Sequence, residues 1–371
     1  MTDNHRSIEF NLHNLVTICV VDGGPADVAA VRRQVGLPAM PVQESGPAPD
    51  ITIRFVDRLD TPGLRYIGVD DAAFTNDAFF VLRGKNKRLI KVQIPFAEIG
   101  TPTTLVSERN VGAIPLLTAI TNLTALAKGA LPLHAAAFCY GGHGVLTTGW
   151  SKGGKTETLL GFMAHGATFI GDEWVYLSPD GARMYGLPEP VRIWEWHLSE
   201  MPEYRARLSP KQRARMALLR VPIALADRAA ERDGNSLLRR ARPLLRRQHG
   251  LNISPQRLFG HDRLLSSGPL DKVFFVVSGE APEVTVEPGD PEDVAARMLF
   301  SLLEEQMPLL SYYWKYRFAF PERPNELLET VQQRQAEALQ RVLAGKELYI
   351  VTHPYPAPIP AMVAAMAPVL A

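Results

Sequence analysis

Hydrophobic positions in the first third of the chain follow the spacing of short strands and helices. Apolar and β-branched residues over Ile8–Val21 predict one or two strands. A helix is predicted at Ala26–Val35, where Gly36 follows as a stop signal, and a second one over Asn110–Lys128. Residues 1–105 are therefore expected to form a mixed α/β module, in which we find no chemical motif.

Strands and helices alternate over the rest of the chain, which predicts an α/β domain over residues 106–371. The central elements are a strand at Leu133–Tyr140, a strand at Gly144–Thr148, a helix at Lys155–His165 and a strand at Ala167–Ile170. Two later helices are predicted at Pro291–Gln306 and Asn325–Ala344.

Composition narrows the class of protein. The 371 residues include 40 Lys plus Arg and 39 Asp plus Glu, so the net charge of +1 gives no overall field that would hold nucleic acid. Cys19 and Cys139 complete neither a zinc pattern nor a disulfide framework, which favours a reducing, cytoplasmic location. The polar N-terminus and the lack of an 18-residue apolar run predict neither secretion nor membrane insertion.

Basic residues gather in the segment Met201–Gly250, which holds thirteen of them against four acidic ones. Helical spacing predicts two basic helices, at Ser209–Arg228 and Ser236–Gln248, as an insertion in the domain. These helices could hold an acidic partner, or they could be a solvated surface whose arginines pair with acids elsewhere. Tyr204 is the only aromatic residue of the segment, which weakens the case for nucleic-acid binding through base stacking.

A phosphate-binding loop (P-loop, Walker A) is predicted between the strand ending at Thr148 and the following helix. The motif G-x-x-x-x-G-K-[ST] is matched by Gly149, Trp150, Ser151, Lys152, Gly153, Gly154, Lys155 and Thr156. Its amides and the helix N-terminus would hold the phosphates of ATP, with Lys155 along the β- and γ-phosphates and the Thr156 hydroxyl on Mg²⁺. A glycine-rich turn without a ligand is the alternative, and the flanking strand and helix disfavour it.

Three further residues are candidates for chemistry. Asp172 follows the strand Ala167–Ile170, where a carboxylate could reach Mg²⁺ or accept a proton from an attacking hydroxyl. Glu173 is its neighbour and a second candidate metal ligand, although an Asp-Glu pair after a strand is often only a solvated turn. His134 could polarise a phosphate or orient the catalytic carboxylate, but a histidine in an apolar strand is more often structural.

The sequence resembles the catalytic domain of HPr kinase/phosphorylase, a bacterial serine kinase whose P-loop fold is related to phosphoenolpyruvate carboxykinase. The resemblance is carried by Leu133–Ala136, by Gly144–Thr158 with its phosphate loop, and by His165–Glu173. It implies that His134 and Asp172 are catalytic, with Asp172 as the base, and that Glu173 stands where the family usually has Asp.

The resemblance is close only over Leu131–Leu177, and the chain departs from the family beyond it. The arginine-glycine signature that supports phosphorylase activity and HPr docking is missing, and Leu187–Arg192 stands at the corresponding place. The Arg-rich segment has no counterpart in the family. Neither reverse phosphorylase activity nor control of sugar uptake is therefore implied.

Together these features predict an ATP- and Mg²⁺-dependent kinase that phosphorylates a hydroxyl, either Ser or Thr of a peptide or protein or, alternatively, a small metabolite. A second hypothesis is a regulatory module that binds ATP without phosphoryl transfer. The sequence does not identify the acceptor or the oligomeric state.

Overall fold

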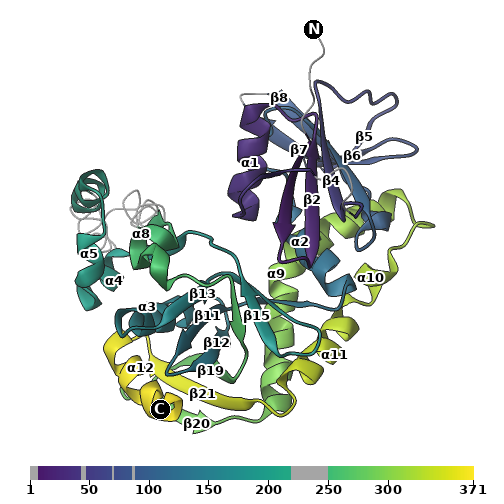
Figure 1. Cartoon of the computed structure of the whole chain (residues 1–371). Helices are drawn as coiled ribbons and strands as arrows, with labels where there is room; N and C mark the ends of the chain where they lie inside the picture. Colours follow the sequence, from purple (N-terminus) through teal and green to yellow (C-terminus); the bar gives the residue numbers. More distant parts are fainter. Residues whose placement is uncertain (1–6, 43–46, 69–70, 86–87, 219–249) are drawn as a thin grey trace, which may run out of the picture. The chain divides into compact units, whose positions relative to one another are not determined.

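The computed structural model describes residues 7–42, 47–68, 71–85, 88–218 and 250–371 (Figure 1). Its helices and several sheets confirm the predicted α/β class. The chain divides into two compact units. The first comprises Met1–His134, Val175–Leu187 and Asp290–Lys346, and the second comprises Ala135–Trp174, Pro188–Gly289 and Glu347–Ala371. Whether residues 1–105 act as a separate module stays a prediction.

A nine-stranded sheet forms the centre of the first unit, in the order β3-β1-β2-β4-β9-β8-β7-β6-β5. Strands β2, β4 and β9 run parallel to one another, and the remaining pairs are antiparallel. The strands are β1 (Ile8–Leu12), β2 (Val16–Val21), β3 (Met40–Pro41), β4 (Ile51–Val56), β5 (Arg65–Ile67), β6 (Ala72–Phe74), β7 (Phe79–Lys85), β8 (Arg88–Gln93) and β9 (Thr103–Glu108). The strand prediction for the first segment is confirmed by the β1–β2 hairpin.

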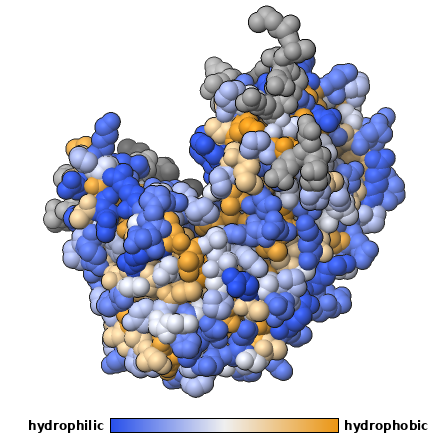
Figure 2. Space-filling view, viewed as in Figure 1, coloured by the Kyte–Doolittle hydropathy of each residue, from blue (hydrophilic) through white to orange (hydrophobic). Residues whose placement is uncertain are grey.

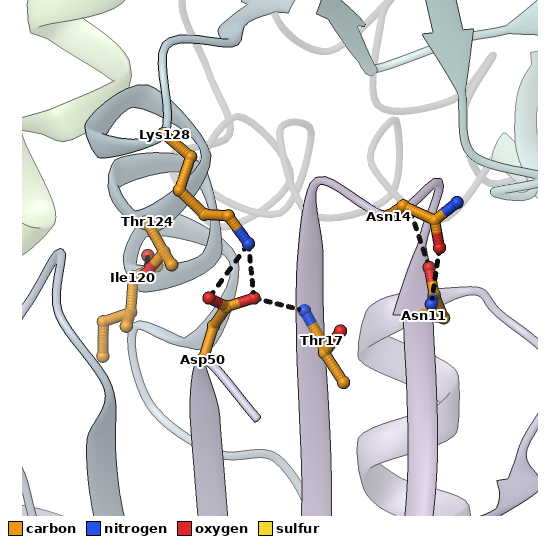
Figure 3. Close-up of polar contacts among 7 residues, drawn as sticks. All are labelled: Asn11, Asn14, Thr17, Asp50, Ile120, Thr124 and Lys128. Atoms are coloured by element: carbon orange, nitrogen blue, oxygen red, sulfur yellow. Dashed lines mark hydrogen bonds and ion pairs between the residues drawn. The ribbon is translucent and has the colours of Figure 1, made fainter. Parts of the chain in front are cut away.

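Asp50 joins three parts of the first unit (Figure 3). Its carboxylate accepts a hydrogen bond of 2.8 Å from the amide of Thr17 in β2 and bonds of 2.9 and 3.0 Å from the ammonium of Lys128. Lys128 directly follows helix α2 (Leu117–Ala127), where a positive charge is favourable at the negative end of the helix dipole. The start of β4 is thereby fixed to its neighbouring strand and helix.

The first two helices show how local residues set helix boundaries. Helix α1 (Pro25–Val35) confirms its prediction and ends at Gly36, whose φ of 73° is the left-handed conformation common after a helix. The prediction that the next helix begins at Asn110 is wrong, because α2 starts seven residues later. Pro115 disfavours helical backbone at the residue before it, and Leu116 has a φ of 62°.

Helix α9 (Pro291–Ala319) is 29 residues long and continues through Pro308, so its predicted end at Gln306 is wrong. Proline inside a helix removes a hydrogen bond, but the half beyond it packs into an aromatic core. The ring of Tyr316 lies 5.4 Å from that of Phe96 and 5.9 Å from that of Phe79. None of the described helices is both long and apolar enough to cross a membrane.

The remaining elements of the first unit include a pair of helices and three strands. The helix predicted at Asn325–Ala344 is interrupted at Thr330, giving α10 (Glu326–Glu329) and α11 (Val331–Leu343). The strand predicted at Leu133–Tyr140 is likewise two strands in different sheets. Strand β10 (Leu131–His134) pairs with β14 (Trp174–Leu177), which pairs with β15 (Arg183–Gly186), and β11 (Ala136–Tyr140) enters the second unit.

A six-stranded sheet forms the second unit, in the order β13-β11-β12-β19-β21-β20. Strands β12, β19 and β21 are parallel, so their carboxyl ends meet at one edge of the sheet. Ligands of α/β proteins commonly bind at such an edge. The strands beyond β11 are β12 (His143–Gly149), β13 (Thr168–Gly171), β19 (Lys272–Gly279), β20 (Thr285–Pro288) and β21 (Glu347–Pro354).

Helices α3 (Lys155–Ala164) and α12 (Ile359–Met366) pack against each other and against this sheet (Figure 1). The ring of Phe162 stacks on that of Phe138 in β11 at 5.0 Å. A large apolar core results, which holds α3 in place on the strands that lead into and out of it.

The Arg-rich segment is described only in part. Its first half contains α5 (Glu203–Ala206) and a helix over 210–218, where the first basic helix was predicted. The prediction for residues 219–228 and for the second basic helix falls outside the described residues. Tyr204, Leu208 and Met216 are buried in the core of the second unit, whereas the basic side chains Arg207, Lys211, Arg213 and Arg215 are exposed. In Figure 2 the described surface around α5 is mainly hydrophilic.

Five other elements of the second unit lie on either side of the Arg-rich segment in the sequence. They are β16 (Val191–Trp194), α4 (Glu195–Glu200), β17 (Gly250–Ile253), α8 (Pro255–Phe259) and β18 (Ser267–Pro269). Strand β16 pairs with β17, so the chain returns beside its own path after the Arg-rich segment.

Close packing of α3 on α12 predicts an unusual response to Gly161→Ala. Alanine normally favours a helix over glycine by about 1 kcal/mol. At Gly161, however, an added Cβ would lie 2.5 Å from Cγ2 of Val363 and 2.9 Å from Cγ2 of Ile359. We expect the free energy of unfolding in urea to fall by about 1–2 kcal/mol. Val363→Ala should recover part of this loss in the double variant, and a more stable Gly161→Ala protein would contradict the packing.

Candidate functional site

The predicted phosphate loop connects the carboxyl end of β12 to the first residue of α3. Gly149 has a φ of 148°, and a Cβ at this position would lie 2.4 Å from the carbonyl oxygen of Val276 in the neighbouring strand. Gly154 has a φ of 107°, and its Cβ would lie 2.7 Å from Nε2 of His353. Only glycine fits either position, so the loop follows a path that side chains would block.

Lys155 lies folded back over the loop that precedes it. The side chain is buried, and its ammonium donates hydrogen bonds to the carbonyl oxygens of Gly149 at 3.1 Å and Trp150 at 2.9 Å. A positive charge is therefore held at the curve of the loop. Residues 150–152, by contrast, are exposed to solvent.

Thr156 and Asp172 are brought together although they are sixteen positions apart. The Thr156 hydroxyl lies 3.2 Å from each carboxylate oxygen of Asp172, and it can donate its hydrogen to either. Thr156 is in the first turn of α3, and Asp172 directly follows β13, with only 3% of its surface exposed. A hydroxyl and a carboxylate at this spacing are the kind of oxygen ligands that Mg²⁺ uses.

Glu173 turns away from its neighbour. It has a φ of 72°, which is rare for a residue with a side chain, and its side chain is exposed while that of Asp172 is buried. Its carbonyl oxygen accepts a hydrogen bond from the amide of Ala135 at 3.1 Å. The turn therefore separates the two acids, and the contact with Thr156 is made by Asp172.

The environment of Asp172 disfavours its charged form. Burial, together with the charges of Glu173 and Glu157, raises the pKa of the Asp172 carboxyl from 3.8 to about 7, although the hydrogen bond from the Thr156 hydroxyl lowers it. A carboxyl with a pKa near neutrality can accept a proton from a hydroxyl and release it again. A divalent cation beside it would lower the pKa.

Sequence reasoning missed a buried acid and histidine pair beside this site. Glu157 follows Thr156 in α3, and its Oε1 accepts a hydrogen bond of 2.9 Å from Nε2 of His197 in α4. The other ring nitrogen, Nδ1, accepts from the amide of Trp194, so in the neutral ring the proton is on Nε2. Burial raises the pKa of Glu157, but the hydrogen bond from His197 and the charge of Lys155 lower it more, so the pKa is below its usual value.

His353 at the end of β21 was also missed, and it contacts the loop directly. Its ring is buried, with Nε2 lying 2.8 Å from the carbonyl oxygen of Gly153 and Nδ1 lying 2.8 Å from that of Pro354. Because C=O and N–H point in opposite directions in a trans peptide, fixing the Gly153 carbonyl also aims the amide of Gly154. No local pattern distinguishes His353 from another buried strand residue, since the contact spans 200 positions.

His134 belongs to the first unit, where its Nδ1 lies 2.6 Å from Oε1 of Glu305 in α9. Its predicted action on a phosphate stays a prediction. Among the described residues no group of three or more His, Cys, Asp or Glu side chains could hold a metal ion. Mg²⁺ in nucleotide sites is commonly held by one or two protein ligands together with phosphates and water, so Thr156 and Asp172 still fit it.

Comparison with known proteins gives little further information. No family model and no curated protein matches the sequence. Among solved structures, the chain is similar to the HPr(Ser) kinase/phosphatase from Coxiella burnetii, with 14% sequence identity over 52% of this chain and 99% of that one, at a TM-score of 0.22. The residues of the site therefore have to carry any functional proposal.

The raised pKa of Asp172 predicts a stability that depends on pH. In the unfolded chain the carboxyl ionises near pH 4, whereas in the folded protein it ionises near 7, so the folded state binds more protons between these values. The contribution of this group to stability is therefore largest below pH 4 and is lost as the pH rises to 7. We expect Asp172→Asn, in EDTA, to be more stable than the parent protein by about 2–4 kcal/mol at pH 8.

The advantage of Asp172→Asn should shrink toward zero near pH 4, as measured by urea unfolding at both pH values. Asp262→Asn, at an exposed position in the second unit, is the matched control and should change little. A variant that is destabilised equally at both pH values would show that burial of the Asp172 charge is not costly.

The His353 contact predicts that a residue outside the motif controls nucleotide affinity. In His353→Ala the Gly153 carbonyl loses its partner, and we expect the stability to fall by about 1–3 kcal/mol and the affinity for a fluorescent ATP analogue to fall by about tenfold. His165→Ala is the control, since that exposed ring also contacts a backbone oxygen, at Gly161, but at the other end of α3. Equal affinities for the two variants would contradict a role of His353 in the loop.

Proposed function

We propose that the chain is a kinase that binds ATP with Mg²⁺ and transfers the γ-phosphoryl group to a hydroxyl, that of Ser or Thr in a peptide or protein. The observation that carries this proposal is the contact between the Thr156 hydroxyl and the Asp172 carboxylate at the start of α3. A phosphate loop alone is compatible with many nucleotide-binding proteins. A buried carboxylate beside its threonine adds both a metal ligand and a base.

The phosphate loop would bind and orient the triphosphate. Amides at the N-terminus of α3 have no partners within the helix, and the helix dipole adds partial positive charge there. Lys155 is held by two loop carbonyls and would contact the β- and γ-phosphate oxygens when the nucleotide is bound. Gly149–Thr156 therefore supplies the positioning and the charge stabilisation on which phosphoryl transfer depends.

Asp172 would act on the acceptor. Thr156 and Asp172 would hold Mg²⁺, which would supply positive charge to stabilise the negative charge that develops on the phosphates. Asp172 would accept the proton of the attacking hydroxyl through one carboxylate oxygen. The Glu157–His197 hydrogen bond joins the first turn of α3, which carries Thr156, to α4.

Two other parts of the chain enter the proposal. His134, held by Glu305, would polarise a phosphate or orient the base, as the sequence resemblance implies. The exposed basic residues between Arg207 and Arg215 would favour an acidic acceptor.

Two substitutions test the proposal, with a fluorescent ATP analogue for binding and γ-labelled ATP with a library of acidic Ser and Thr peptides for transfer. Lys155→Ala should weaken binding by about tenfold or more and abolish transfer, because a charged partner of the phosphates is lost. Asp172→Asn should leave binding within about twofold but lower kcat by about 10²–10⁴-fold, the usual contribution of a general base.

Asp262→Asn again serves as the control and should retain full activity. Normal turnover by Asp172→Asn would show that Asp172 is not the base. If the parent protein binds the analogue but transfers nothing to peptides or to small hydroxyl compounds, the alternative of a regulatory ATP-binding module is favoured.

A further inference from the structure

Helix α9 has two apolar faces, and only one of them is used by the first unit. The buried face contains Met298, Leu302, Leu309, Tyr313 and Tyr316, which pack into the core of that unit. The other face carries four large hydrophobic side chains that are exposed to solvent: Phe300 (60%), Met307 (42%), Trp314 (56%) and Phe318 (75%). We call these four residues the α9 stripe.

The α9 stripe follows one side of the helix. At 3.6 residues per turn its members lie within about 40° of one another, and they face about 180° away from the buried side. They span about 27 Å, at 1.5 Å per residue. A surface helix normally has one apolar stripe, and a second one of this size marks an interaction surface.

We propose that the α9 stripe is the interface of a two-fold homodimer, in which α9 pairs in an antiparallel manner with the same helix of a second copy. The surface that the α9 stripe would bury is large enough for a weak homodimer. The exposed parts of four such side chains amount to roughly 500 Å² per copy, or about 1,000 Å² for the pair, which is near the lower limit for a specific interface. A second copy supplies an apolar surface of equal length.

The order of residues along the stripe is self-complementary. Phe300 and Phe318 are equally far from Leu309, so a two-fold axis at the level of Leu309 places Phe300 of one copy opposite Phe318 of the other. On one flank of this contact Trp314 then faces the half-buried Leu303. On the other flank the exposed Glu304 faces Lys315, whose ammonium also contacts Asp71 in its own copy.

Aromatic contacts at both ends and opposite charges on one flank define this register. A parallel arrangement would place identical residues together, including Glu304 against Glu304, which is unfavourable. The small buried area corresponds to a weak dimer, with a dissociation constant on the order of 10 µM. Dimer formation should therefore depend on concentration.

Charge substitutions at the two ends test both the dimer and its register, by sedimentation velocity of the full chain across a concentration series. Phe318→Glu and Phe300→Lys should each weaken dimerisation by about tenfold or more. The double variant should regain it, because the introduced lysine of one copy then faces the introduced glutamate of the other. Within one helix these positions are too far apart to compensate each other.

Tyr66→Glu is the matched control, since Tyr66 is also an aromatic residue of the first unit with 60% of its surface exposed. It should dimerise like the parent protein, and the circular dichroism of all variants should be unchanged. A parent protein that stays monomeric at about tenfold above the expected dissociation constant would overturn the proposal. Loss of dimerisation in the single variants without recovery in the double variant would overturn the antiparallel register.

Discussion

The backbone path of the phosphate loop is the constraint on which the candidate site depends. Gly149, at the end of strand β12, lies so close to the carbonyl of Val276 that no side chain would fit there. The buried ring of His353 contacts the loop at the carbonyl of Gly153. These contacts come from β19 and β21, the two strands that run parallel to β12. A planar peptide held by its carbonyl has its N–H direction fixed as well, so the strands determine where the loop amides point.

The path of the loop also brings several charged side chains into a buried environment. The charged or polar groups closest to the loop and its helix are largely shielded from water. They are Lys155, Asp172 and the Glu157–His197 pair. The ammonium of Lys155 donates hydrogen bonds to two loop carbonyls, whereas Asp172 has two acids near it and a pKa raised to about 7. A carboxylate held in this way costs stability in the folded protein, which is common at sites where chemistry takes place.

In the first unit, the long helix α9 packs against the core with one of its faces. Aromatic contacts from β7 and the segment after β8 hold α9 beyond Pro308, in spite of the hydrogen bond that proline removes. The side chains that face away from this core include large aromatic residues, which water solvates poorly. Core packing therefore explains why one face of α9 is apolar, and the proposed self-association explains why the opposite face is apolar as well.

Several features of this protein were determined by its sequence alone. The α/β class, the limits of α1 and α3 and the strand before the phosphate loop follow from hydrophobic spacing and glycine signals, which act over a few residues. The motif from Gly149 to Thr156 is equally local. Tertiary structure decided what local signals do not encode. These features are the division of Leu133–Tyr140 between two sheets, the continuation of α9 past Pro308, and the approach of His197 and His353 to the loop and its helix. Those outcomes depend on contacts between residues far apart in the chain, where packing and burial outweigh local propensity.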